Sequence, residues 1–90
     1  MKYFALLREI LGVGEEEYEL EDGVTLYDLL LNHIPERHRN AAEAWRDKIK
    51  RFLEGESPGY IVIVNGNRAD PDKRLRDGDV VAVLPPVGGG

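Results

Sequence analysis

The sequence has no cysteine, only one serine and only one threonine. Without cysteine, the chain has no disulfide, no thiolate metal site, no iron–sulfur cluster and no cysteine nucleophile. Ser57 lies beside a proline in a predicted loop, and Thr25 begins a predicted helix. Neither has a histidine at a spacing typical of a nucleophile–base pair, so the sequence offers no side-chain nucleophile.

Long apolar runs and an excess of basic residues are also missing. No apolar run approaches the roughly 20 residues that a membrane-spanning helix needs, and no signal-peptide pattern follows Met1. The formal net charge of −5 argues against nucleic acid or an anionic membrane as the main partner. We therefore predict a cytoplasmic protein that binds no nucleic acid and no membrane.

The histidines and aspartates form no metal-binding pattern. His33 and His38 are five residues apart, whereas paired ligands on a helix are four apart, so we predict surface histidines. The aspartates between residues 70 and 79 flank predicted turns, where their side chains stabilise the backbone. They lack the spacing of a calcium loop, and we predict no metal site.

Five segments have strand patterns. Residues 15–21 alternate, with glutamates on one side and Tyr18 and Leu20 on the other, which predicts a half-buried strand with a solvated acidic edge. Asn65-Gly66 predicts a tight hairpin into a short returning strand at residues 67–69. Three further runs are apolar throughout and predict strands buried on both faces: residues 2–7, 60–64 and 80–84.

Two helical stretches lie between these strands. Thr25 and Asp28 resemble a capping box, and Pro35 ends the first helix or restarts it. A second helical pattern runs from Glu36 to Leu53, with Trp45 as a predicted core anchor and Gly55 as a stop signal. The first helix carries one apolar stripe: Leu26, Leu29, Leu30 and Ile34.

The order of these elements predicts the fold class. Strand, strand, helices, strand, short strand, strand is typical of an α+β roll of the β-grasp or ubiquitin-like type. We expect a mixed sheet of about four to five strands packed on one main helix, with an extended second helix. The β-grasp domain is predicted to cover residues 1–84.

A flexible tail is predicted over residues 85–90, Pro-Pro-Val-Gly-Gly-Gly. Past the prolines it can extend about 13 Å, and glycine lets it pass through a narrow channel. Its terminal carboxylate is ionised at neutral pH, and adenylation would make its carbonyl carbon open to attack by sulfur or an amine. Since no other reactive group is predicted, Gly90 is the candidate reactive residue.

Several motifs resemble those of the small subunit of molybdopterin synthase, one of the ubiquitin-like sulfur carriers. The main one is Leu75-x-Asp77-Gly78-Asp79-Val80-Val81-x-Val83-x-Pro85-Pro86-Val87-Gly88-Gly89-Gly90. The others are Lys2-Tyr3-Phe4-Ala5-x-x-Arg8-Glu9, Gly23-x-Thr25-x-x-Asp28-Leu29-Leu30 and Val64-Asn65-Gly66. The sequence departs from the family pattern in three places. The helical stretch at residues 36–55 is longer than the corresponding stretch in the shortest members. Leu84 stands where the family commonly has an aromatic residue, and Gly88 stands where it often has another small residue before the final two glycines.

The resemblance implies a mechanism in which the catalytic side chains belong to partner proteins. An ATP-dependent activating enzyme adenylates Gly90, a sulfur donor converts it to a thiocarboxylate, and the large subunit of molybdopterin synthase receives the tail. Sulfur then passes to a pterin precursor. No cofactor is bound, and ATP is consumed by the activating partner. Leu84, Pro85, Pro86 and Val87 would aim the tail, which continues through Gly88 and Gly89 to Gly90. Leu84 and Phe4 are predicted partner contacts.

Three alternatives remain open from the sequence. The chain could be a protein modifier that is joined to lysines through Gly90, or a β-grasp interaction domain with an inert tail. A carrier role in thiamine synthesis is disfavoured by the length of the chain and by the Pro-Pro step. The residues favour neither the molybdenum nor the tungsten cofactor route.

Overall fold

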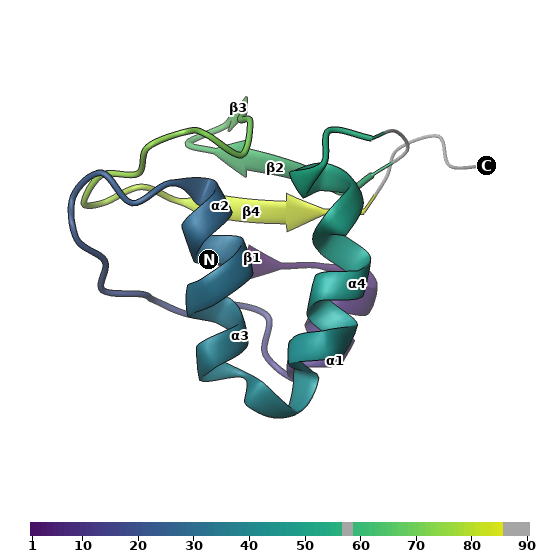
Figure 1. The fold of residues 1–90 in the computed structure, drawn as a ribbon. Coiled ribbons are helices and arrows are strands. Elements are labelled where there is room, and N and C mark those ends of the chain that lie inside the picture. The colour runs from purple at the N-terminus through teal and green to yellow at the C-terminus, as the bar shows by residue number, and fades with distance from the viewer. Residues whose placement is uncertain (57–58, 86–90) are drawn as a thin grey trace.

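The computed structural model describes residues 1–56 and 59–85 (Figure 1). The first half contains β1 (Lys2–Tyr3), α1 (Ala5–Leu11), α2 (Leu26–Asp28), the π-helical turn η1 (Leu29–His33) and α3 (Ile34–Arg37). The second half contains the 3₁₀ turn η2 (Arg39–Ala41), α4 (Ala42–Leu53), β2 (Ile61–Val64), β3 (Asn67–Arg68) and β4 (Val81–Leu84).

The four strands form one mixed sheet in the order β1-β4-β2-β3. β1 pairs parallel to β4, with Tyr3 opposite Val83, and β2 pairs antiparallel to both β4 and β3. Helices α2, α3 and α4 lie together on one side of the sheet (Figure 1). The predicted α+β class, with a four-stranded mixed sheet packed on helices, is confirmed.

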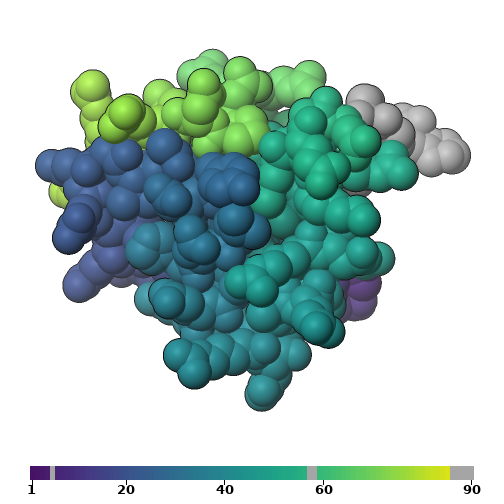
Figure 2. Space-filling model, in the orientation of Figure 1, coloured from purple at the N-terminus to yellow at the C-terminus, as the bar shows by residue number. Residues whose placement is uncertain are grey.

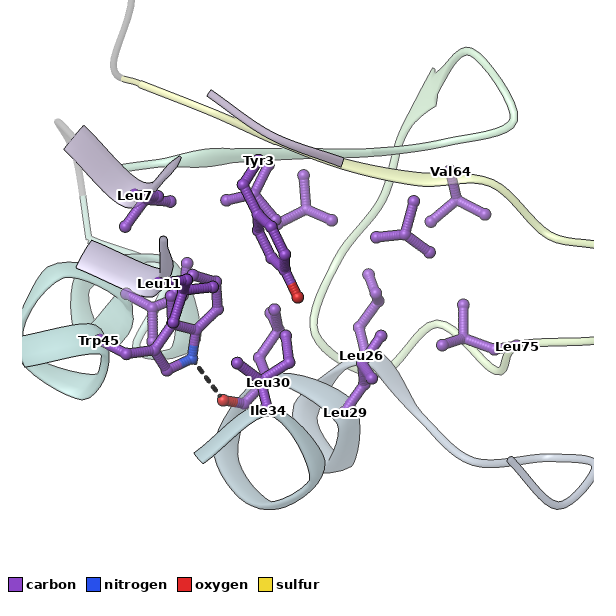
Figure 3. Close-up of a cluster of buried hydrophobic side chains, with 14 residues drawn as sticks. Tyr3, Leu7, Leu11, Leu26, Leu29, Leu30, Ile34, Trp45, Val64 and Leu75 are labelled. Carbon is purple, nitrogen blue, oxygen red and sulfur yellow. Dashed lines mark hydrogen bonds between the residues drawn. The ribbon is translucent and has the colours of Figure 1, made fainter. Parts of the chain in front are cut away.

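The core lies between the sheet and the helices (Figure 3). Trp45 occupies one end of this cluster and Leu75 the other, with Tyr3 between them. Every strand except β3 contributes at least one buried side chain to this core. The predicted apolar stripe of the first helix is buried as well, so that prediction is confirmed. The buried hydrophobic residues of this core cluster are Tyr3, Leu7, Leu11, Leu26, Leu29, Leu30, Ile34, Trp45, Ile49, Val62, Val64, Leu75, Val81 and Val83.

The first predicted strand, residues 2–7, is wrong beyond Tyr3. The chain enters α1 at Ala5, and Leu7 and Leu11 are buried one helical turn apart. Leucine, arginine and glutamate favour helix, and a helix buries this face as completely as a strand would. Gly12 ends the helix in the left-handed conformation at φ 78° and donates its N–H to the carbonyl of Arg8.

The predicted strand at residues 15–21 is also wrong for most of its length. Only Glu15 forms a bridge, opposite Lys2, and the antiparallel register then places Glu16 opposite Met1. Two bonds close this pair, from the Met1 ammonium to the Glu16 carbonyl at 2.8 Å and from the Glu16 N–H to the Met1 carbonyl at 2.9 Å. Residues 17–21 therefore continue past the end of the pairing, although their in–out alternation persists.

The second predicted helix, residues 36–53, is interrupted. His38 leaves helical geometry at φ −115° and ψ 61°, and the chain reverses through η2 before α4 begins. Within α4, Trp45 and Ile49 are buried, so the prediction of a tryptophan anchor is confirmed. Gly55 follows α4 at φ 73° and confirms the predicted stop.

The first helix begins as predicted and then departs from ideal geometry before Pro35. Thr25 Oγ1 accepts the N–H of Asp28 at 3.2 Å, which confirms the cap. In the π-helical turn, Ile34 donates to the carbonyl of Leu29, five residues back. The helical stretch therefore continues through Pro35 rather than ending before it.

Pro35 cannot donate to the carbonyls of Leu30 or Leu31, because proline has no N–H. The indole N–H of Trp45 donates to the Leu30 carbonyl at 2.7 Å (Figure 3). Arg46 Nη2 reaches the Leu31 carbonyl at 3.4 Å. Helix α4 thus supplies hydrogen bonds that the first helix loses at its proline.

The hairpin predicted at Asn65-Gly66 is confirmed. Both residues have positive φ, 52° and 85°, as a two-residue type I′ turn requires. Asn65 also donates its amide to Asp79 Oδ1 at 2.8 Å and accepts the N–H of Val80 at 2.9 Å. The turn is therefore fixed to the segment that leads into β4.

Candidate functional site

Strand β4 leads directly toward the predicted tail. It ends at Leu84, which lies opposite Ile61 of β2, and Pro85 is half-buried just beyond. The predicted reactive residue Gly90 and the predicted tail residues Pro86, Val87, Gly88 and Gly89 lie outside the described residues. Their roles, and the division into a domain and a flexible tail, stay predictions.

The outer face of the sheet carries a row of apolar side chains. Val81 and Val83 point into the core, so Ala82 and Leu84 point away from it, since side chains alternate along a strand. The register places Leu84 beside Ile61, and Ala82 beside Ile63. These residues are half-buried, and the helices pack on the opposite side of the sheet.

Phe4 extends this outer face on the side of β1. It follows Tyr3, whose side chain is buried and which pairs with Val83, and its backbone is extended at φ −130° and ψ 158°. Phe4 therefore lies next to Leu84 and on the opposite face from Tyr3, with 42% of its surface exposed. The structure thus brings together the two residues predicted as partner contacts. We call this surface the sheet-face patch: Phe4, Ile61, Ile63, Ala82 and Leu84.

A second concentration of polar groups surrounds the carboxylate of Glu16, whose side chain is only 13% exposed. Its Oε2 accepts the hydroxyls of Tyr3 at 2.7 Å and of Tyr18 at 2.8 Å, and His38 Nε2 lies 2.8 Å away. Arg37 lies 3.5 Å from Oε1 and stacks over the Tyr18 ring at 3.8 Å. We call these five side chains the Glu16 cluster.

The acid–base properties of the Glu16 cluster suit a structural role. Burial raises the pKa of Glu16, but hydrogen bonds from Tyr3, His38 and Tyr18 outweigh it, and the net pKa is lowered. Burial raises the pKa of Tyr3, and it raises the pKa of Tyr18 to about 12. The carboxylate is thus ionised with its Oε2 already in three contacts, which leaves it poorly placed to act on a substrate.

This cluster corrects two predictions. The acidic edge was expected to be solvated, yet Glu16 is largely buried, and His38 was expected at the surface, yet its side chain is only 16% exposed. The sequence did contain a signal that Glu16 faces inward, because in the alternating pattern it falls on the same side as Tyr18 and Leu20. No local pattern could have paired it with His38, which lies 22 residues away.

Substituting Glu16→Gln should lower the free energy of unfolding at neutral pH and make it depend less on pH in the acidic range. Because the folded pKa lies below the ordinary value of 4.5, the stabilisation is present above that pH and is lost as pH falls through the folded pKa. We expect a loss of about 1–3 kcal/mol in the free energy of unfolding at pH 7. Urea unfolding followed by circular dichroism between about pH 6 and pH 3 measures both effects.

Glu17→Gln is the matched control, since Glu17 is adjacent to Glu16 in the chain but is exposed. We expect this variant to stay within about 0.5 kcal/mol of the parent and to keep its pH dependence. An equal pH profile for the parent and Glu16→Gln would show that the Glu16 cluster does not stabilise the fold through its charge.

The described residues hold little other chemistry. Within residues 1–56 and 59–85, no group of three or more histidines or acids is arranged to hold a metal ion. A backbone hydrogen bond from Arg76 and the amide of Asn65 lower the pKa of Asp79, so this aspartate stabilises a turn as predicted. None of the helices among these residues has the length and apolar character required to cross a membrane.

Comparison with known proteins connects this architecture to a family. The sequence matches the ThiS family over residues 1–90, the full chain given. This chain belongs to the ThiS family. It is also 35% identical over 88 residues to the molybdopterin synthase sulfur carrier subunit of Chlamydomonas reinhardtii, covering 98% of this chain and 93% of that protein.

Solved structures support the same ThiS-family assignment. A putative molybdopterin converting factor, subunit 1, from Pyrococcus furiosus is 39% identical, with a TM-score of 0.72, over 96% of this chain and 93% of the other. The small archaeal modifier protein 1 of Haloferax volcanii is 26% identical, with a TM-score of 0.66, over 96% and 93%. The predicted resemblance to the ubiquitin-like sulfur carriers is therefore confirmed.

Proposed function

We propose that this ThiS-family chain is the sulfur carrier subunit of a molybdopterin synthase. The observation that carries the proposal is its full-length likeness to the sulfur carrier subunit of Chlamydomonas reinhardtii. The Pyrococcus furiosus structure supports the same assignment at higher identity. We place the protein in the cytoplasm, where ATP and the proposed partner enzymes would act on it.

The proposed chemistry takes place at Gly90. A carboxylate oxygen attacks the α-phosphate of ATP in an activating enzyme, and pyrophosphate leaves. Hydrosulfide released by the sulfur donor then attacks the carbonyl carbon, AMP leaves, and a thiocarboxylate remains. In the large subunit, the sulfur passes to a pterin precursor, and an oxygen from water restores the carboxylate for another cycle.

The proposed role of the fold is to present this terminus. β4 is held between β1 and β2, so its end at Leu84 is fixed in direction relative to the sheet-face patch. A partner that docks on this patch would find the start of the tail at the edge of the contact. Docking and delivery are thereby coupled through one strand, and the reactive side chains are supplied by the partners.

Intact mass spectrometry tests the proposal directly. The chain is incubated with the activating enzyme of its host, ATP and a sulfur donor. We expect a mass gain equal to the exchange of one oxygen for sulfur, located at Gly90 by fragmentation. Omission of ATP is the control, and an unchanged mass in the complete reaction would overturn the carrier assignment.

A protein modifier joined to lysines through Gly90 is the second candidate. The likeness to small archaeal modifier protein 1 of Haloferax volcanii favours it. Both functions use the same acyl-adenylate, so they differ only in the nucleophile that follows. Lysine-linked conjugates of the tagged chain in extracts of its host would support the modifier, and their loss on deletion of Gly90 is the control.

Replacing Phe4 by alanine should weaken binding to the large subunit without changing stability. Phe4 is an exposed aromatic beside Leu84, and aromatic side chains at the centre of an interface contribute strongly to affinity. We expect a loss of about 1–2 kcal/mol, or roughly 5–30-fold in Kd. Calorimetric titration of the large subunit measures it.

Tyr27→Ala is the matched control for Phe4→Ala. Tyr27 is 45% exposed but lies in α2, on the opposite side of the sheet from the sheet-face patch. Its substitution should leave the Kd within about twofold of the parent. Equal losses for both variants would remove the sheet-face patch as the docking surface.

A further inference from the structure

A groove with a volume of about 230 Å³ lies at the opposite end of β4 from the tail. Its walls are the segment around Tyr18 to Asp22 and the loop from Leu75 to Asp79. This volume is below the roughly 300–1,000 Å³ typical of small-molecule sites. The groove therefore fits one or two side chains of a protein better than a cofactor.

The floor of this groove is apolar and already ordered. Leu29, Leu75 and Val81 line it, and each is at least 95% buried in the core. Leu29 and Leu75 lie at the end of the core away from Trp45 (Figure 3). An apolar side chain that entered would therefore contact a packed surface without rearranging it.

The walls are held in place by backbone hydrogen bonds between distant segments. Leu75 donates its N–H to the Val24 carbonyl at 2.8 Å and accepts that of Gly23 at 3.3 Å. The segments near residues 23–27 and 71–75 lie side by side (Figure 2). The groove is thus preorganised by contacts that its occupant does not need to form.

The rim is strongly acidic. Glu19, Glu21, Asp22 and Asp77 line the groove and are exposed, whereas Arg76 is the only arginine or lysine among its lining residues. The remaining cationic group there is the Met1 ammonium, which already donates to the carbonyl of Glu16. An occupant that carries lysine or arginine would complement this rim.

The wall segment also offers backbone groups. Among residues 1–56 and 59–85, no backbone hydrogen bond joins residues 18–20 to another segment. Their alternation continues that of a strand, with Tyr18 and Leu20 half-buried beside exposed glutamates. Such an edge can pair with an added extended segment.

We propose that this groove binds an extended, basic segment of a partner protein. One apolar side chain of that segment rests on the floor formed by Leu29, Leu75 and Val81, and flanking lysines or arginines contact the acidic rim. A second copy of this chain is a poor occupant, because its terminal carboxylate and net charge of −5 would be repelled. The groove and the end of β4 at Leu84 lie at opposite ends of the strand, so one partner can hold the groove while the tail is engaged elsewhere.

The test is an NMR titration of the full ¹⁵N-labelled chain with the synthetic peptide Arg-Val-Arg-Val-Arg. We expect shifts concentrated in residues 18–22 and 75–81. The peptide Glu-Val-Glu-Val-Glu should produce none, and Arg-Gly-Arg-Gly-Arg should bind several-fold more weakly because it lacks the apolar anchor. The peptide comparison needs no variant, so it is independent of any folding defect.

Charge reversal provides the second arm. The double variant Glu19→Lys and Glu21→Lys should raise the Kd for the Arg-Val-Arg-Val-Arg peptide by about tenfold or more. The matched control, Glu54→Lys and Glu56→Lys, makes the same change in net charge at exposed residues after α4 and should alter the Kd by less than about twofold. Amide dispersion verifies that both variants are folded.

Three results would overturn the proposal. One is a set of shifts spread over all acidic surfaces, and another is equal binding of the Arg-Val and Arg-Gly peptides. The third is an equal loss of affinity in the two double variants. Each would show that the peptide senses only the net charge of the chain. None of them bears on sulfur transfer at Gly90, which the mass assay tests separately.

Discussion

Deletion of Gly89 and Gly90 should abolish sulfur transfer while leaving the fold intact. The proposed reaction occurs at the carboxylate of Gly90, and no group elsewhere in the described residues can replace it. Truncation would move the terminal carboxylate back by two residues, about 7 Å of extended chain. In the mass assay we expect no detectable oxygen-to-sulfur exchange, a loss of at least about 100-fold.

Stability should barely change in the same variant. Within residues 1–56 and 59–85, the last buried core residue is Val83. We expect the midpoint of thermal unfolding to shift by less than about 2 °C, since the tail is predicted to lie outside the core and such chain termini contribute little to stability. Scanning calorimetry of the two chains provides the comparison.

Appending one alanine after Gly90 is the complementary variant. This variant keeps all 90 residues, but the carboxyl group of Gly90 becomes part of a peptide bond. The terminal carboxylate then belongs to the added alanine, which also carries a side chain. We expect the same loss of transfer and an unchanged fold. Efficient thiocarboxylate formation on the truncated chain would refute the assignment of Gly90, and a large loss of stability in either variant would show that the tail belongs to the core.

Replacing Trp45 by alanine should cause the largest loss of stability of any substitution considered. Trp45 has no exposed surface and meets Tyr3 edge-to-face, with ring centroids 5.7 Å apart. It also donates to the Leu30 carbonyl. Truncation of such a buried aromatic costs about 3–5 kcal/mol in the free energy of unfolding. Urea unfolding must be followed by circular dichroism, because this is the only tryptophan.

Trp45→Phe separates packing from hydrogen bonding. Phenylalanine keeps the aromatic contact but leaves the Leu30 carbonyl without its indole donor, which should cost about 1–3 kcal/mol. Replacing Pro35 by alanine restores a backbone N–H in the helix. If the indole compensates for the proline, Trp45→Phe should cost less in the Pro35→Ala background. An equal cost in both backgrounds would show that the two residues are not coupled.

The sequence predicted those features that local chemistry controls. Asn65-Gly66 dictated a turn with two positive φ angles, and the stripe from Leu26 to Ile34 dictated a buried helical face. The run 2–7 was ambiguous because a short apolar segment can be buried as strand or helix. Here Leu7 and Leu11 face the core from α1, which only the position of α4 beside it makes possible.

The candidate site was predictable in part for the same reason. Phe4 and Leu84 were predicted as partner contacts from the family resemblance, but their adjacency depends on the parallel pairing of β1 with β4, between segments about 80 residues apart in the chain. The Glu16 cluster required Glu16 and His38 to meet from different elements. A local pattern contains no information on such a pair, because its energy arises only when both are removed from water.

The sequence by itself determined the fold class, the family and the candidate reactive residue. Each depends on the order of local patterns and on a terminal motif, and these are properties of the linear chain. Only the tertiary structure decided where the pairing of residues 15–21 stops, which carboxylate is buried and where the acidic groove opens. These features depend on register and on long-range burial, which the free energy of the assembled core fixes and neighbouring residues do not.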